Sequence, residues 1–143
     1  MYIDHNVKKI LIVEDDLALR PLWERFFNNQ TDSIDVGWAV SCEEGLKMIH
    51  QANKNGDSYY LIITDIFLAG SGTGIELIKS PEVNKSGAKT VLISVADRDD
   101  VIKQFGYLIP ETVIISKPLD FKKYATIFKK LLNNELSYNR NGP

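Results

Sequence analysis

The sequence contains little cysteine, little histidine and no large excess of charge of either sign. Its one cysteine, Cys42, cannot form an internal disulfide, so nothing implies an oxidising compartment. The histidines, His5 and His50, have no His or Cys partner at the spacing of a zinc site. The 17 Lys+Arg and 19 Asp+Glu residues give a net charge of -2. We therefore expect no zinc site, no direct nucleic-acid binding and no polybasic membrane anchor.

Long hydrophobic runs are also missing. The longest apolar runs have about five residues, far fewer than a membrane span needs. The polar segment from Met1 to Lys9 does not resemble a signal peptide. The 143 residues are 44% hydrophobic and 25% charged, as in an ordinary globular domain. We predict one domain over residues 1–133, a short polar tail over residues 134–143, and a cytoplasmic location.

Short apolar segments that are rich in β-branched residues indicate the strands. Because these runs are nearly continuous, they are typical of parallel strands buried on both faces. A fifth segment, Ile34 to Val40, is more mixed and predicts an edge strand. The four continuous segments are Ile10 to Val13, Leu61 to Ile63, Val91 to Ile93 and Val113 to Ile115.

Segments with helical spacing of apolar residues alternate with the strands. The predicted helices cover residues 17–28, 41–53, 74–79, 98–105 and 120–133. Asp15 or Asp16 can cap the first helix, Ser41 the second and Asp120 the last. Pro81 is expected to disturb the chain after the third helix. The alternation predicts an α/β fold with helices on both faces of a parallel sheet.

Polar side chains follow four of the strands directly. The carboxyl ends of parallel strands share one edge of a sheet, where ligands bind in open α/β folds. These residues should therefore lie close together: Glu14, Asp15 and Asp16 after the first strand, then Asp65, Ser94 and Lys117.

The charges at this predicted edge do not balance without a cation. Glu14, Asp15 and Asp65 contribute -3 and Lys117 contributes +1, so one divalent cation would bring the sum to zero. A site made of oxygen ligands suits Mg²⁺. A carboxylate there can also attack phosphorus and form an acyl phosphate.

Four motifs in this order resemble the receiver domain of bacterial two-component response regulators. They are Ile10 to Asp16, Ile63 to Asp65, Ile93 to Ala96 and Ser116 to Pro118. Their key residues, Asp15, Asp65, Ser94 and Lys117, are 50, 29 and 23 positions apart, and the resemblance covers about residues 8–133. It implies a flavodoxin-like three-layer α/β/α sandwich with a five-stranded parallel sheet in the order 2-1-3-4-5.

The resemblance also implies roles at the predicted edge. Asp65 matches the phospho-accepting aspartate of the family. Glu14 and Asp15 match its acidic pair, of which Asp15 would contact Mg²⁺ directly and Glu14 through water. The backbone carbonyl of Phe67 matches the third protein ligand.

Two further positions match groups that act on the phosphoryl group itself. Ser94 matches the switch hydroxyl and Lys117 the lysine that contacts the phosphoryl group. The donor would be a histidine kinase or a histidine phosphotransfer protein. We expect a signalling domain rather than an enzyme, one that catalyses only its own phosphorylation and dephosphorylation. Because only about ten residues follow the last predicted helix, the signal would leave through an unknown downstream protein or a phosphorylation-dependent homodimer.

Two positions depart from the family pattern. The loop after Asp65 is one residue longer and has Ala69 in place of a proline. Ile114 occupies the position of an aromatic residue that swings in many relatives. We therefore expect the backbone from Val95 to Phe105 to carry the conformational change. The family commonly has a cis bond at Lys117-Pro118, and we expect one here.

Two alternative functions remain open. A degenerate receiver would keep the fold as a protein-binding scaffold, although every charged residue of the motifs is present. An aspartate-dependent phosphohydrolase of the haloacid dehalogenase type would need a second aspartate where Phe67 stands. The glycines Gly70, Gly72 and Gly74 lack the ending of a phosphate-binding P-loop, so we interpret them as a flexible turn.

Overall fold

The computed structural model of the chain describes residues 7–30, 33–106 and 112–133. Its strands form a five-stranded sheet in the order β2-β1-β3-β4-β5, and all four pairings are parallel. The predicted strand order is therefore confirmed, with β2 at one edge. The predicted tail, residues 134–143, lies outside the described residues, as does His5. The strands are β1 (Val7–Val13), β2 (Ser33–Ala39), β3 (Leu61–Asp65), β4 (Lys89–Ser94) and β5 (Val113–Ser116).

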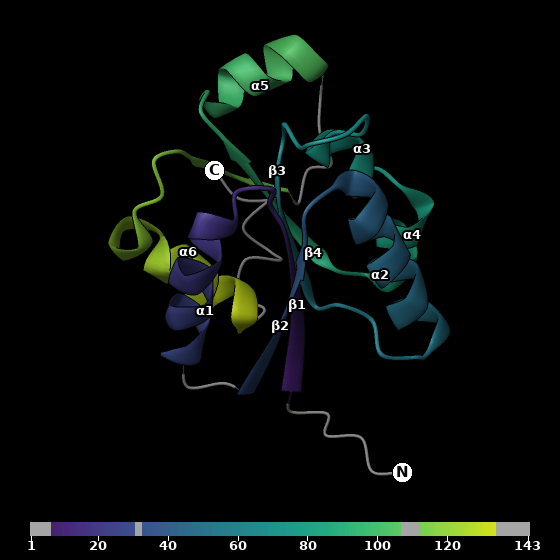
Figure 1. Cartoon of the computed structure of the whole chain (residues 1–143). Coiled ribbons are helices and arrows are strands. Elements are labelled where there is room, and N and C mark those ends of the chain that lie inside the picture. The colour runs from purple at the N-terminus through teal and green to yellow at the C-terminus, as the bar shows by residue number, and fades with distance from the viewer. Residues whose placement is uncertain (1–6, 31–32, 107–111, 134–143) are drawn as a thin grey trace.

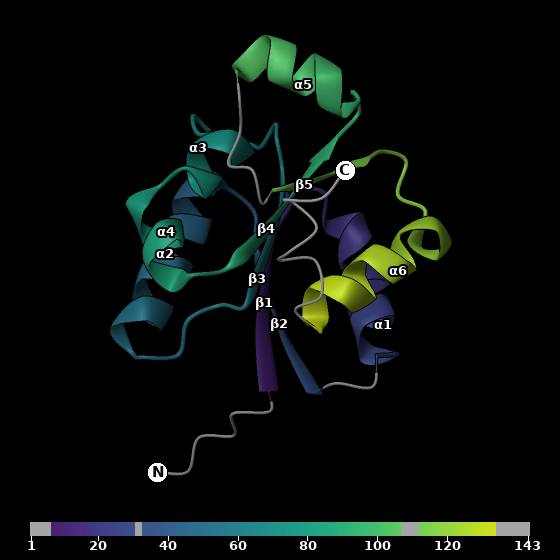
Figure 2. The same ribbon diagram turned by 180° about the vertical axis from the view of Figure 1, so that it is seen from behind.

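Helices cover both faces of the sheet, which confirms the predicted three layers. One face carries α1 (Arg20–Asn28) and α6 (Phe121–Leu132), and the other carries α2 (Cys42–Lys54), α3 (Gly74–Ile78) and α4 (Pro81–Ser86) (Figure 1). Figure 2 shows β5 beside β4 together with the full length of α6. The helix α5 (Arg98–Phe105) stands beyond the carboxyl ends of the strands in all three ribbon views. Within the described ranges, no helix has both the length and the apolar character that crossing a membrane requires.

The strands send alternate side chains into two separate cores. Ile10 and Ile12 of β1 pack with the residues of α1 and α6. Leu11 and Val13 of the same strand pack on the opposite face with residues of α2 and α3. All four are fully buried. Burial on both faces explains why β1 has a continuous apolar sequence instead of an alternating one.

Aromatic rings fill the core between the sheet, α1 and α6. The Trp23 ring stacks on Phe27 at a centroid distance of 5.9 Å. It also meets Phe128 edge-on at 5.6 Å and Phe121 edge-on at 5.0 Å. Phe26 is only half-buried but contacts the same rings. Trp23 and Phe27 are fully buried, so these α1 aromatics form the centre of this core.

Two local features differ from the sequence predictions. The first helix was predicted from residue 17, but residues Leu17–Leu19 form a 3-10 turn and α1 begins at Arg20. Asp16 caps that 3-10 turn by accepting a hydrogen bond from the Ala18 amide at 3.0 Å. Pro81 does not merely disturb a helix. It begins a separate one, α4, because the residue before a proline is held in an extended conformation.

The other predicted helix caps are present. The Ser41 hydroxyl accepts from the Glu44 amide at 3.1 Å and begins α2. The Asp120 carboxylate accepts from the Lys123 amide at 3.2 Å and begins α6. Both caps satisfy amides that the helix itself leaves unpaired.

The ring cluster makes a stability prediction. Phe128→Ala removes a fully buried ring and should lower the unfolding free energy by about 3–5 kcal/mol. Lys122→Ala changes an exposed side chain of the same helix and should stay within about 0.5 kcal/mol. Urea denaturation of both variants measures the difference. Equal losses would show that the ring cluster does not hold α6 on the sheet.

Candidate functional site

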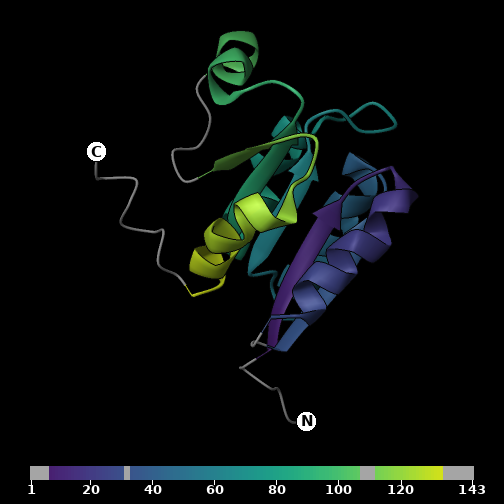
Figure 3. The same cartoon turned by 90° about the vertical axis from the view of Figure 1, so that its left-hand side faces the viewer.

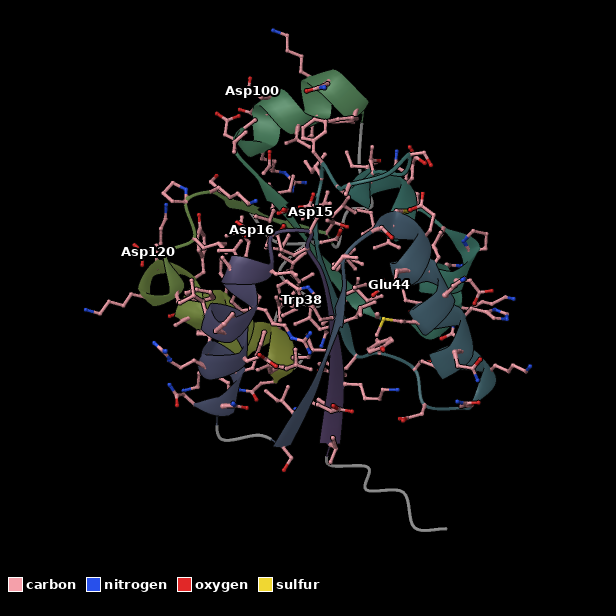
Figure 4. The ribbon with its side chains drawn as sticks, viewed as in Figure 1. Asp15, Asp16, Trp38, Glu44, Asp100 and Asp120 are labelled. Carbon is pink, nitrogen blue, oxygen red and sulfur yellow. The ribbon has the colours of Figure 1, made fainter. Side chains whose placement is uncertain are left out.

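Three carboxylates meet at the carboxyl end of the sheet. Glu14 and Asp15 follow β1, and Asp65 ends β3, the neighbour of β1 in the sheet. One oxygen from each residue lies within 4.8 Å of the other two. Glu14 and Asp65 are buried, with 2% and 5% exposure, whereas Asp15 is exposed. Figure 4 shows Asp15 and Asp16 at the end of β1 nearest α5.

A single ammonium group reaches the two buried carboxylates. Lys117 Nζ donates to Asp65 Oδ2 at 2.9 Å and lies 3.5 Å from Glu14 Oε1. Lys117 follows β5, and its amide donates to the Ser94 carbonyl at 2.7 Å. The Lys117-Pro118 bond is cis, as predicted. The strand order therefore brings together groups that are 103 positions apart, from residue 14 to residue 117.

Each of the two buried carboxylates keeps one oxygen that accepts no hydrogen bond from the described residues. Glu14 Oε1 and Asp65 Oδ1 are buried and have no hydrogen-bond partner among the described residues. A buried acceptor without a partner is costly, more so when it is charged. These oxygens, together with the exposed carboxylate of Asp15, form a donor set that fits a hard divalent cation such as Mg²⁺.

Burial and the neighbouring charged groups shift two pKa values. Burial, followed by the neighbouring Asp65 carboxylate, raises the pKa of Glu14 from 4.5 to about 8. For Lys117, burial favours the neutral amine, but the hydrogen bond and charge of Asp65, joined by Glu14, outweigh it and raise its pKa. Without a cation, the cluster at neutral pH thus holds a proton on Glu14 and an ammonium on Lys117. Both reduce the repulsion around Asp65.

Ser94 and Phe67 lie at the same end of the sheet but outside this cluster of contacts. The Ser94 hydroxyl is buried and accepts from the Ala96 amide at 3.0 Å. No hydrogen bond among the described residues joins it to the carboxylates. The Phe67 side chain is 61% exposed, and its ring lies 6.0 Å from that of Phe105 in α5. This contact between the loop and α5 was not predicted.

Two of the glycines after Asp65, which the sequence suggested form a flexible turn, are closely packed. Gly74 lies so close to the Asp65 carbonyl that a Cβ there would overlap it. Its amide donates to the Ile66 carbonyl at 2.7 Å. Gly72 packs against Cys42, where a Cβ would lie 2.6 Å from the cysteine Cβ. The turn is therefore closely packed, and a glycine at every second position was the available signal of close backbone approach.

The raised pKa of Glu14 predicts a pH effect in protein without bound metal. The folded chain keeps a proton from pH 4.5 to about 8 that the unfolded chain has lost. Stability should therefore fall as the pH rises through this window. Denaturation in EDTA should show a larger loss from pH 6 to pH 9 for the wild type than for Glu14→Gln. The exposed Glu44→Gln should behave as the wild type, and parallel curves for all three would contradict the shift.

Comparison with known proteins agrees with the fold and the motifs. The sequence model of the response regulator receiver domain matches residues 10–129. A response regulator receiver protein from Sinorhizobium medicae aligns with a TM-score of 0.72 and 19% identity over 92% of this chain and 99% of its own. A two-component response regulator from Clostridium difficile aligns with a TM-score of 0.68 and 24% identity over 88% and 96%.

A receiver domain protein from Methanospirillum hungatei gives a TM-score of 0.66 at 22% identity, over 90% of this chain and 96% of its own. At such identities the structures support the fold, and the family match over most of the chain supports the assignment. Five parallel strands in the order 2-1-3-4-5 and three carboxylates at one end of the sheet agree with both. The chain belongs to the response regulator receiver domain family.

Proposed function

We propose that the chain accepts a phosphoryl group on Asp65 in a Mg²⁺-dependent reaction and signals through a conformational change. A histidine kinase or a histidine phosphotransfer protein is the proposed donor, and a protein is the proposed recipient of the signal. The observation that carries the proposal is the difference between the two carboxylate oxygens of Asp65. Lys117 Nζ holds its Oδ2 at 2.9 Å, while Oδ1 is left without a hydrogen bond among the described residues.

The two oxygens of Asp65 suit different tasks. Oδ1 would form the new bond to phosphorus while the bond between phosphorus and the donor breaks. Lys117, which already contacts Oδ2, would then neutralise part of the charge on the phosphoryl oxygens. Mg²⁺ bound by Asp15, Asp65, the Phe67 carbonyl and, through water, Glu14 would add positive charge there. The protein itself therefore contributes mainly positioning and charge neutralisation.

The charged groups of the site favour an active receiver over a degenerate scaffold. A scaffold that never met a phosphoryl group would have no use for the carboxylates that crowd within 4.8 Å of one another. Burial of two of them is costly. Chemistry limited to the domain's own phosphorylation and dephosphorylation needs no further catalytic group. We propose a cytoplasmic location, where such a donor and ATP meet, and no contact with membrane or nucleic acid.

We propose that the response travels through the segment after β4. Ser94 ends β4, and its hydroxyl would turn from the Ala96 amide toward a phosphoryl group on Asp65. The backbone from Val95 into α5 would then move. Little packing opposes this movement, because α5 buries one residue, Val101, within the described chain. Ile114 packs beside α5 and is stiff at χ1, so it should move little. The movement would expose a different surface of α5, β5 and α6 to a partner or a second copy.

Phosphorylation of Asp65 is tested directly by intact-mass spectrometry after incubation with Mg²⁺ and acetyl phosphate. The wild type should gain a single phosphoryl group, and Asp65→Asn should gain none. Asp35→Asn, a change of an exposed aspartate in β2, should be modified as the wild type is. An unmodified wild type would favour the scaffold, and steady hydrolysis of added phosphomonoesters would favour a phosphohydrolase.

Metal binding makes a second test. Asp15→Asn should abolish Mg²⁺ binding in a calorimetric titration because it removes the exposed carboxylate of the three. Asp16→Asn removes the same charge from the next residue, which caps the 3-10 turn and lies outside the cluster, so it should bind Mg²⁺ as the wild type does. Equal binding by both variants would contradict the proposed ligand set.

A further inference from the structure

The loop between β3 and α3 is tied to the first turn of α2. The Ser71 hydroxyl donates to Glu43 Oε1 at 3.0 Å. A backbone bridge joins Ala69 to Ser41, the residue that caps α2. Gly72 packs on Cys42. Figure 3 shows the loop extending beyond the ends of the strands, so these contacts attach its outer part to α2.

Glu43 provides the charged part of this attachment. Gly70 has a φ of +91° and its α-carbon faces the Glu43 carboxylate, since a Cβ there would lie 3.2 Å from Oε2. The backbone amide of Glu43 itself, the Ser71 hydroxyl and the Gly72 amide lower the pKa of the Glu43 carboxyl. Glu43 is therefore a carboxylate at neutral pH, and hydrogen bonds to a charged acceptor are the stronger kind.

The same loop contains the proposed carbonyl ligand. Its two ends lie side by side near Asp65, since the Gly74 amide donates to the Ile66 carbonyl and Phe67 bridges to Thr73. The chain just before α2 also contacts the acidic pair, because the Glu14 amide donates to the carbonyl of Ala39, the last residue of β2, at 2.8 Å. A shift of the loop on α2 would therefore change where the Phe67 carbonyl lies relative to Asp65.

The composition of the loop explains why it needs an external attachment. It contains Gly70 and Gly72 and ends at Gly74, the first residue of α3. Glycine loses the most conformational entropy on ordering. A loop of this kind is not held by its own backbone preferences. Contacts with α2 must order it.

We propose that Glu43 is a positioning residue that sets the Mg²⁺ affinity of the site by holding the loop on α2 through Ser71. This inference rests on the proposed function, in which the Phe67 carbonyl and Asp65 bind Mg²⁺. Glu43 touches neither the cation nor the phosphoryl group. Its effect passes through the loop backbone, in the way that groups behind a metal ligand commonly act.

The test measures Mg²⁺ binding to the full chain by titration followed by amide chemical shifts. Glu43→Ala and Ser71→Ala should each weaken binding by about 10-fold. The double variant should be no weaker than either single variant, because both break the same contact. Ser71→Thr keeps the hydroxyl and should restore wild-type affinity.

The matched control is Glu44→Ala. Glu44 lies beside Glu43 in the first turn of α2, is also exposed, and its side chain makes no hydrogen bond with the described chain (Figure 4). The Glu44→Ala change removes the same charge from the same end of the helix, so the Mg²⁺ affinity of this variant should change by less than about twofold. In metal-free protein, the Gly72 amide should exchange faster in Glu43→Ala than in Glu44→Ala.

Several results separate the possible failures. Wild-type affinity in Glu43→Ala would overturn the positioning role while leaving Mg²⁺ binding and the proposed function intact. Equal losses in Glu43→Ala and Glu44→Ala would also overturn it, because long-range charge would then explain both. A wild type that binds no Mg²⁺ would contradict the proposed function itself and the positioning role with it.

Discussion

The structure depends on one electrostatic constraint, the placement of two buried carboxylates beside each other. β1 and β3 are neighbours in a parallel sheet, so Glu14 and Asp65 must meet where the strands end. Burial and proximity disfavour two negative charges there. The chain relieves this with the ammonium of Lys117 and, in the absence of metal, with a proton on Glu14. A divalent cation would do the same while leaving both carboxylates ionised.

The rest of the fold keeps this arrangement rigid. Both faces of the sheet are buried, so the strand register that aligns the carboxylates cannot slip without exposing a core. Gly74 begins α3 directly against the Asp65 carbonyl, where no other residue fits. Its packing holds the end of the loop against Asp65, and the Ser71–Glu43 contact holds the outer part. The carboxylate cluster is therefore firmly held. By contrast, α5 buries only one side chain, Val101, within the described chain.

Much of this was predictable because it follows from local patterns. Continuous β-branched runs predicted four strands, the more mixed segment from Ile34 to Val40 predicted the fifth, and Ser41 and Asp120 predicted two helix starts. The resemblance supplied the strand order. The second helix at Pro81 and the 3-10 turn before Arg20 were missed, since each depends on one or two backbone angles. The contact between Ser71 and Glu43 joins residues 28 positions apart and has no local signature. The shifted pKa of Glu14 likewise required knowing its burial.

A crystal structure of the chain with Mg²⁺ and beryllofluoride tests the central claim most directly. Beryllofluoride mimics a phosphoryl group on a carboxylate, so it reports which oxygen accepts the group and which residues respond. The account predicts beryllium bonded to Asp65 Oδ1, Lys117 Nζ on a fluorine, and Mg²⁺ in contact with Asp15, Asp65 and the Phe67 carbonyl. Beryllofluoride on another residue, or Mg²⁺ bound away from Asp15 and Asp65, would contradict it.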